Sequence, residues 1–168
     1  MVLVETERAD TEVAVRRASA SAAETMRIGE AVGKVLAPGD LLLLRGEIGA
    51  GKTTFVKGVA AGLGIEEPVV SPTFLLHLIY EGRLTLNHFD FYRLDDPSEA
   101  LIFGLDETLD SGGVALVEWA DRIPTALRPP YLDIELEPGH GADDRLLAFR
   151  PAGGSWAERL AALPELRG

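Results

Sequence analysis

The residues best suited to do chemistry in this chain form one glycine-rich stretch. Residues 46–53 read GEIGAGKT and match the pattern G-x-x-x-x-G-K-[ST]. Glycines in such a stretch let the backbone curl so that its N–H groups point inward around a diphosphate. The ammonium group of Lys52 can reach the terminal phosphates, and the hydroxyl group of Thr53 can coordinate magnesium. The stretch therefore predicts a P-loop, with a nucleotide contacted by Gly46, Glu47, Ile48, Gly49, Ala50, Gly51, Lys52, Thr53 and Thr54.

The segments on either side of the stretch are those that a P-loop requires. Four consecutive leucines at 41–44 are typical of a strand that is covered on both faces. A helix is expected over residues 52–62, because apolar side chains recur on one side and glycines follow at its end. Its unpaired N–H groups and positive dipole end would face bound phosphates. A turn that only joins a strand to a helix is the weaker interpretation, because such a turn needs no lysine followed by threonine.

A P-loop also needs an acidic residue that helps to hold magnesium, usually at the end of a neighbouring strand. Two strand-like runs each provide one candidate: Glu118 ends VALVE, and Asp90 ends LTLNHFD. Either acid, taken alone, is more often a solvated carboxylate at a strand end. Beside a P-loop the balance reverses, and both become candidates for the metal.

The rest of the chain reads as further elements of one α/β domain. Ser21 begins a capping box ahead of a helix that stops before Pro38. Alternation of strands and helices predicts a single-domain P-loop NTPase over residues 1–168, with a mostly parallel central sheet plus antiparallel strands, flanked by helices. The ends, 1–11 and 164–168, are expected to be mobile. The other expected elements are strands at 12–16, 114–117, 131–137 and 145–150, a hairpin of 74–80 with 84–89, and helices within 95–110 and at 155–163.

Composition and charge exclude several classes of function. The 168 residues carry a formal net charge of -11, which repels a nucleic-acid backbone at long range and argues against a wide surface for it. Cysteine is absent, so disulfides, thiolate zinc sites and thiol nucleophiles are excluded. No run approaches the roughly 20 apolar residues of a membrane helix, and the start of the sequence lacks a signal peptide's apolar core. We therefore expect a cytoplasmic protein without a membrane contact.

The nucleotide is inferred by elimination. GTPases recognise guanine with an [NT]-K-x-D stretch, but the single asparagine, Asn87, is followed by histidine, and no Thr-Lys pair occurs. ATP with Mg²⁺ is therefore the expected cofactor. Two rival functions stay open: a P-loop kinase for a small metabolite, whose lid could use Arg122 and Arg128, and a binding module that holds ATP without hydrolysing it.

Three further motifs follow the glycine-rich stretch in order. They are SPTF at 71–74, HFDFYR at 88–93 and EW at 118–119. With GEIGAGKTT at 46–54 they resemble the TsaE (YjeE) family, small bacterial P-loop ATPases needed for threonylcarbamoyladenosine modification of tRNA. The resemblance runs from about residue 21 to 119 and more loosely to 150. The P-loop alone is generic, whereas this combination is much more specific.

The resemblance implies roles for residues at the phosphates. Lys52 would bind the β- and γ-phosphates and take part in catalysis. Thr53 and Glu118 would bind magnesium, directly or through water. Asp90 would orient or deprotonate the attacking water, which makes it the second catalytic residue. Thr73 would lie in a switch-like loop that senses the γ-phosphate.

The resemblance also implies contacts farther from the chemistry. Trp119 would pack beside the nucleotide, and the segment around Ser21 would lie near the adenine. The family's usual threonine after SPT[FY] is Leu75 here, so a hydroxyl contact at that position is not expected. His88 either hydrogen-bonds a phosphate or a neighbouring acid, or packs as a polar strand residue. Arg93 either offsets transition-state charge or pairs with a nearby acid.

Partners follow from the same resemblance. Family members work with the threonylcarbamoyl-transferase subunit and its inactive paralogue, the TsaD and TsaB type proteins, and ATP hydrolysis resets that complex. The transferase complex modifies adenosine 37 of ANN-decoding tRNAs. Because this chain is strongly acidic, tRNA is expected to contact it only indirectly.

Overall fold

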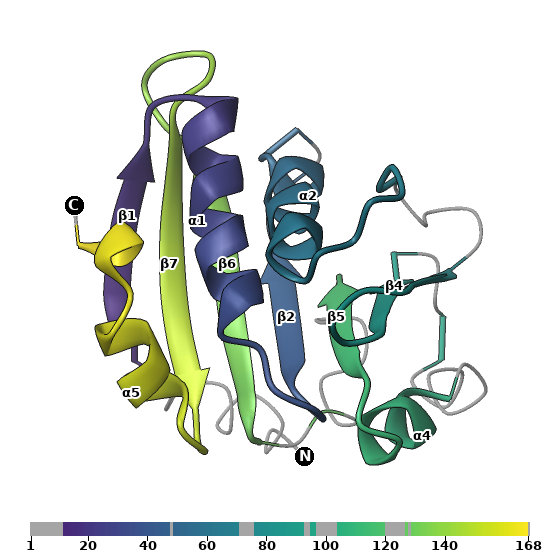
Figure 1. Ribbon diagram of the computed structural model, residues 1–168. Helices are drawn as coiled ribbons and strands as arrows, with labels where there is room; N and C mark the ends of the chain where they lie inside the picture. The colour runs from purple at the N-terminus through teal and green to yellow at the C-terminus, as the bar shows by residue number, and fades with distance from the viewer. Residues whose placement is uncertain are drawn as a thin grey trace.

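The computed structural model describes residues 12–47, 49–70, 76–92, 95–96, 104–119, 127 and 129–167. Figure 1 shows the helices and strands with their labels. In chain order they are β1 (Val15–Ser19), α1 (Ala22–Lys34), β2 (Leu41–Arg45), α2 (Lys52–Gly62), β3 (His77–Tyr80), β4 (Leu86–Asp90), α4 (Leu105–Asp110), β5 (Val114–Glu118), β6 (Tyr131–Pro138), β7 (Arg145–Ala152), α5 (Trp156–Ala161) and the 3₁₀ turn η2 (Pro164–Leu166).

The described strands form one seven-stranded sheet in the order β1-β7-β6-β2-β5-β4-β3. The four central strands are parallel, because β2 pairs in parallel with both β5 and β6, and β5 pairs in parallel with β4. The outer pairs, β1 with β7, β6 with β7 and β3 with β4, are antiparallel. This arrangement confirms the predicted α/β fold with a parallel centre and added antiparallel strands.

Both faces of the central strands are covered, as the four leucines predict. Leu42 and Leu44 point to the face where helices α1 and α2 pack, and they join a large apolar cluster there. Leu41 and Leu43 point to the opposite face and join a smaller cluster that includes Leu105 of α4. This alternation follows from the two-residue period of a strand. In Figure 1, α1 and α2 lie side by side across one face of the sheet.

The predicted elements match the structure with small shifts. The first strand covers Val15–Ser19 rather than 12–16, because its pairing with β7 sets the register: Val15 lies opposite Phe149. The capping box at α1 is confirmed, since the Ser21 hydroxyl accepts a hydrogen bond from the Glu24 backbone N–H at 3.1 Å. The Glu24 carboxylate accepts from the N–H of Ala20, one residue earlier than usual.

Some expectations fall at the ends of the described ranges. Of the helix expected within 95–110, the structure describes α4 at its end, and residues 97–103 lie outside the described residues. Mobility of 164–168 stays a prediction, although Leu166 of η2 is buried against the main core. Residues 1–11 are also outside the described ranges. Of the helices that those ranges contain, none has the length and apolar character needed to cross a bilayer.

Four glycines let α1 and α2 approach each other closely. A Cβ atom on Gly58 would lie 2.2 Å from the backbone oxygen of Met26, and one on Gly33 would lie 2.3 Å from that of Val59. Gly29 and Gly62 meet similar backbone contacts. Because backbone atoms cannot rotate away as side chains do, the two helices are held at this distance. The second half of α2, the helix that begins at Lys52, is thereby packed closely against α1.

Replacing Gly58 with alanine should therefore destabilise the protein. On an unobstructed helix this change stabilises by about 1 kcal/mol, because glycine is a poor helix former. Here the added methyl group overpacks the helix crossing, which typically costs about 1–3 kcal/mol. Urea unfolding followed by circular dichroism should show a lower free energy of unfolding for Gly58→Ala. Lys57→Ala, on the exposed neighbouring position, should stay within about 0.5 kcal/mol. Unchanged or increased stability of Gly58→Ala would show that the helices can separate without cost.

Candidate functional site

The predicted acidic residues lie together at one edge of the sheet. In the register of the parallel strands, Asp90 at the end of β4 lies opposite Glu118 at the end of β5, and Glu118 lies opposite Leu44 of β2. The chain leaves β2 one residue later and enters the glycine-rich loop, residues 46–53. Both acids are buried, with 3% and 4% of their surface exposed. The structure therefore brings Asp90, Glu118 and the glycine-rich loop to the same edge.

The glycine-rich loop has a backbone that only glycine adopts readily. Gly51, the N-cap residue of α2, has φ 97°, and Gly46 has φ 153°. A Cβ on Gly46 would also lie 2.8 Å from the backbone oxygen of Leu136 on β6. These two positions are fixed glycines in the sequence pattern, and the structure explains both by conformation and by close approach. Ile48 lies outside the described residues.

Lys52 points back over the loop that precedes it. Its ammonium nitrogen donates a hydrogen bond to the backbone oxygen of Gly46 at 2.5 Å and lies 4.0 Å from the centre of the Trp119 ring. The side chain is largely buried, at 7% exposure. Attraction between a cation and an aromatic face helps to hold the ammonium group here. A positive charge therefore lies across the loop, beside the first turn of α2.

Trp119 adopts an unusual backbone conformation directly after Glu118. Its φ is 60°, in the left-handed region that side chains other than glycine rarely occupy. The indole packs against Tyr92, with ring centroids 4.9 Å apart, as well as against Lys52. Such a conformation persists only where surrounding contacts hold it. The turn after β5 thus directs the indole toward the lysine rather than away from the site.

The two acids have different hydrogen-bond partners. The Oε2 atom of Glu118 lies 2.6 Å from Nε2 of His88, and both side chains are almost fully buried. The Oδ1 atom of Asp90 accepts a hydrogen bond from the Tyr92 backbone N–H at 2.9 Å. His88 precedes Asp90 by two residues on β4, so the two share the face of the sheet that packs against the helices. Among the alternatives left open for His88, the structure shows contact with a neighbouring acid, Glu118.

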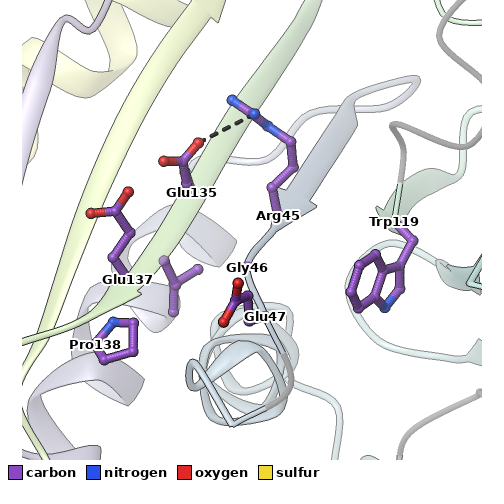
Figure 2. Close-up of a pocket in the computed structure, with 8 residues that line it drawn as sticks. Arg45, Gly46, Glu47, Trp119, Glu135, Glu137 and Pro138 are labelled. Atoms are coloured by element: carbon purple, nitrogen blue, oxygen red, sulfur yellow. Dashed lines mark ion pairs between the residues drawn. The ribbon is translucent and has the colours of Figure 1, made fainter.

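A pocket of about 670 Å³ opens beside the glycine-rich loop. Figure 2 shows Trp119 on one side of it, Glu135 and Glu137 on the other, and Glu47 between them. Arg45 pairs with Glu135 at 3.2 Å and with Asp133 at 2.9 Å. A hydrogen bond with Glu135, together with the charge of that residue, raises the pKa of the Glu137 carboxyl above its ordinary value. The pocket is therefore rich in carboxylates, with one guanidinium group among them.

Sequence reasoning missed two contributions from the end of the chain. The acids of β6 occupy alternate positions, and this period-two pattern could have predicted a shared face. Arg145 of β7 donates a hydrogen bond from Nη2 to the backbone oxygen of Gly49 at 3.1 Å and so contacts the glycine-rich loop. No motif links residues that are 96 positions apart, and only the sheet order brings them together.

The remaining predicted residues divide between described and undescribed parts. Ser21 caps α1, and its neighbours Ala22 and Thr25 line a small cavity of about 30 Å³ together with Gly51 and Thr54. The beginnings of α1 and α2 therefore lie next to each other, as a contact from the Ser21 segment to a nucleotide would require. Thr53 is exposed in the first turn of α2. Thr73 and the rest of SPTF lie outside the described residues.

These elements define an α/β protein whose candidate site lies where the parallel strands end, the usual ligand position in such folds. The family model for the threonylcarbamoyl adenosine biosynthesis protein TsaE matches residues 19–146. This match covers most of the chain, and the chain therefore belongs to the TsaE family, whose members are involved in tRNA threonylcarbamoyladenosine biosynthesis. The family resemblance inferred from the motifs is confirmed.

Similar proteins support the same assignment. The chain is 46% identical over 131 residues to the tRNA threonylcarbamoyladenosine biosynthesis protein TsaE of Bacillus subtilis (strain 168), covering 77% of this chain and 81% of that protein. It is 45% identical over 117 residues to the protein of the same name from Treponema pallidum (strain Nichols), covering 70% and 86%. The crystal structure of Bacillus subtilis YdiB superposes with a TM-score of 0.78 at 35% identity, covering 92% of this chain and 96% of that one.

The pH dependence of stability should include a contribution from His77, next to the site. Its half-buried ring stacks on Phe89 with centroids 4.1 Å apart, and Nε2 lies 3.0 Å from Oδ1 of Asn87. Burial lowers the pKa of the His77 ring below 6.5, although the hydrogen bond to Asn87 opposes this change. The unfolded chain then binds the proton more readily, so this contribution is present above pH 6.5 and is lost as the pH falls below it.

His77→Phe, which keeps an aromatic ring against Phe89, should lose less stability than the wild type on acidification. Urea unfolding at about pH 7.5 and about pH 5 compares the two proteins. A titration followed by proton NMR should also place the midpoint of the His77 ring below 6.5. A midpoint at or above that value, or equal losses of stability in both proteins, would contradict the assigned effect of burial.

Proposed function

We propose that this protein is a magnesium-dependent ATPase that supports the threonylcarbamoyl-transferase complex in modifying adenosine 37 of ANN-decoding tRNAs. The observation that carries the proposal is the position of Lys52, whose buried ammonium group lies over the glycine-rich loop at the start of α2. A lysine held in this way, next to unpaired helix N–H groups, suits the phosphates of a nucleotide. Membership of the TsaE family supplies the tRNA-modification context.

The chain offers several groups of matching charge to a triphosphate. The first turn of α2 has N–H groups without helical partners and the positive end of the helix dipole. Gly46, Gly49 and Gly51 leave three positions of the preceding loop without a side chain. Lys52 would exchange its bond to the Gly46 oxygen for a phosphate oxygen. Because a phosphate carries full negative charge, this exchange strengthens the hydrogen bond.

The donor atoms at the site fit magnesium. Mg²⁺ prefers oxygen ligands and is commonly held by one or two protein oxygens together with phosphate oxygens and waters. The hydroxyl of Thr53, exposed in the first turn of α2, and the carboxylate of Glu118, at the neighbouring strand end, are such oxygens. When bound, magnesium offsets the negative charge on the phosphate oxygens. In this proposal Thr53 and Glu118 hold the metal.

Asp90 is the residue proposed to position the attacking water. It lies one strand beyond Glu118, and the turn that contains Tyr92 fixes its Oδ1 atom. A carboxylate held in this way can accept a hydrogen bond from water and orient it toward the terminal phosphate. Hydrolysis of this kind depends mainly on positioning and on compensation of charge. Trp119 and the Ser21 segment would then contact the nucleotide away from the reacting bond.

Partner proteins complete the proposal. The partners would be the TsaD and TsaB type subunits, and the net charge of -11 is consistent with tRNA being held by them rather than by this chain. ATP hydrolysis would reset the complex between rounds of modification. Slow turnover is expected for the chain alone, because an arginine supplied in trans is worth about 10³–10⁵ in the rate of related enzymes.

Nucleotide binding is tested first with Lys52→Ala. Titration calorimetry with Mg·ATP should detect binding to the wild type and a loss of affinity of at least about tenfold in the variant, since a charged hydrogen bond contributes roughly 1.5–3 kcal/mol. Lys57→Ala removes the same charge from the exposed side of the same helix and should bind as the wild type does. Absence of heat with the wild type at millimolar Mg·ATP would refute the proposed ATPase.

Catalysis is tested with Asp90→Asn, which retains an oxygen for the Tyr92 N–H group. The variant should bind Mg·ATP with nearly unchanged affinity but hydrolyse it about 10²-fold more slowly, because an amide cannot accept the proton of water. Phosphate release is measured with the TsaD and TsaB type subunits present. If the variant instead lost binding and kept its turnover per bound nucleotide, Asp90 would be a binding residue. Faster transfer to a metabolite than to water would favour a kinase.

A further inference from the structure

We propose that His88 is a positioning residue that orients Glu118 for the metal. The inference rests on the proposed function, because it takes Glu118 as a ligand of magnesium. His88 would act through its contact with Glu118 and would touch neither the metal nor the nucleotide. The observation behind it is the hydrogen bond between Nε2 of His88 and Oε2 of Glu118, 2.6 Å long and buried on both sides.

The contact is diagonal across two parallel strands. His88 lies opposite Leu116, and Glu118 lies two residues farther along β5, on the same face of the sheet. Neighbours at this diagonal are too far apart for short side chains but within reach of a glutamate and an imidazole. The pairing therefore depends on side chains long enough to meet across the diagonal. The backbone of the sheet fixes both ends, so the bond holds the carboxyl group in one orientation.

The two carboxyl oxygens of Glu118 have different surroundings. Oε2 accepts from His88, whereas no hydrogen bond reaches Oε1 from the part of the chain that the structure describes. A glutamate has three rotatable bonds, so an unanchored carboxylate would have to be ordered when the metal binds. With Oε2 anchored, the direction of Oε1 is already set. Hydrogen-bonded partners of this kind are typical behind metal-binding carboxylates, and their loss costs about 10–100-fold in metal affinity or activity.

The other ring nitrogen supports a specific tautomer. Nδ1 of His88 is buried and has no hydrogen-bond partner among the described residues. A proton on Nδ1 would be a buried N–H donor without an acceptor among the described residues, and such orphaned donors are rarer in proteins than acceptors without a partner. The proton therefore belongs on Nε2, where it points at Glu118. A residue present only for packing would not require this asymmetry.

Two amide substitutions separate the positioning role from packing. The side-chain nitrogen of His88→Gln can occupy the place of Nε2 and donate to Glu118, whereas that of His88→Asn lies near Nδ1 and cannot reach. The measured quantity is the Mg²⁺ concentration that half-saturates ATP hydrolysis. His88→Asn should raise it about 10–100-fold, and His88→Gln should stay within about threefold of the wild type. Binding of ATP in EDTA should change by less than about twofold in both variants.

The outcomes distinguish this inference from the proposed function. A wild-type chain that neither binds nor hydrolyses Mg·ATP would refute both. Suppose instead that ATP hydrolysis by the wild type depends on magnesium, and that His88→Asn is folded and half-saturates at the same Mg²⁺ concentration. That result would refute the role of His88 but leave the proposed function standing. Equal loss of metal-free and metal-dependent binding in both variants would assign His88 to packing and would also overturn the inference.

A measurement on the wild type covers the case in which His88→Asn does not fold. Nitrogen-15 NMR of the histidine rings distinguishes the two neutral tautomers, and the chain has only three histidines to assign. The expected result is an Nε2–H tautomer for His88, with a resonance that shifts when Mg·ATP is added. An Nδ1–H tautomer would overturn the inference, because Nε2 would then have no proton to give to Glu118.

Discussion

The parallel pairing of β2, β5 and β4 is the constraint on which the candidate site depends. Because these strands run in one direction, the chain leaves each of them at the same edge of the sheet. Arg45, Glu118 and Asp90 end the three strands, so the glycine-rich loop and the two acids must be neighbours. The glycine contacts hold α2, which begins at Lys52 directly after the loop, close against α1. A shift of one residue in the pairing of β4 with β5 would turn Asp90 to the face opposite Glu118.

The sequence could predict the parts of this site that local physics determines. The four leucines of β2, the capping box at Ser21 and the helix after Gly51 each follow from residues close in the chain, and the structure has all three. Contacts made through the sheet order could not be predicted in this way. Arg145 reaches Gly49 only because β7 pairs with β6 and β6 lies beside β2. The exact span of β1 was likewise set by pairing with β7 rather than by its own pattern.

His88 illustrates the same limit inside the site. Its place in HFDFYR indicated that it lies next to Asp90 in sequence, but not which acid it contacts. Because side chains alternate along β4, His88 and Asp90, two positions apart, lie on the same face of the sheet. The neighbouring strand then decides the partner, because Glu118 of β5 is diagonal to His88 and opposite Asp90. Residue type and spacing along one strand cannot contain this information.

Burial of the polar residues has a consequence for how the site works. Lys52, His88, Asp90 and Glu118 are all nearly inaccessible to solvent, and each is held by a contact within the fold. Burying such groups is unfavourable unless they are paired, so their placement lowers the free energy of unfolding of the protein. In return, little reorganisation is needed when a charged ligand arrives, and charges act more strongly away from water. The positive charge of Lys52 and the start of α2 therefore act locally, at short range, whereas the net charge of -11 is screened beyond about 8–10 Å.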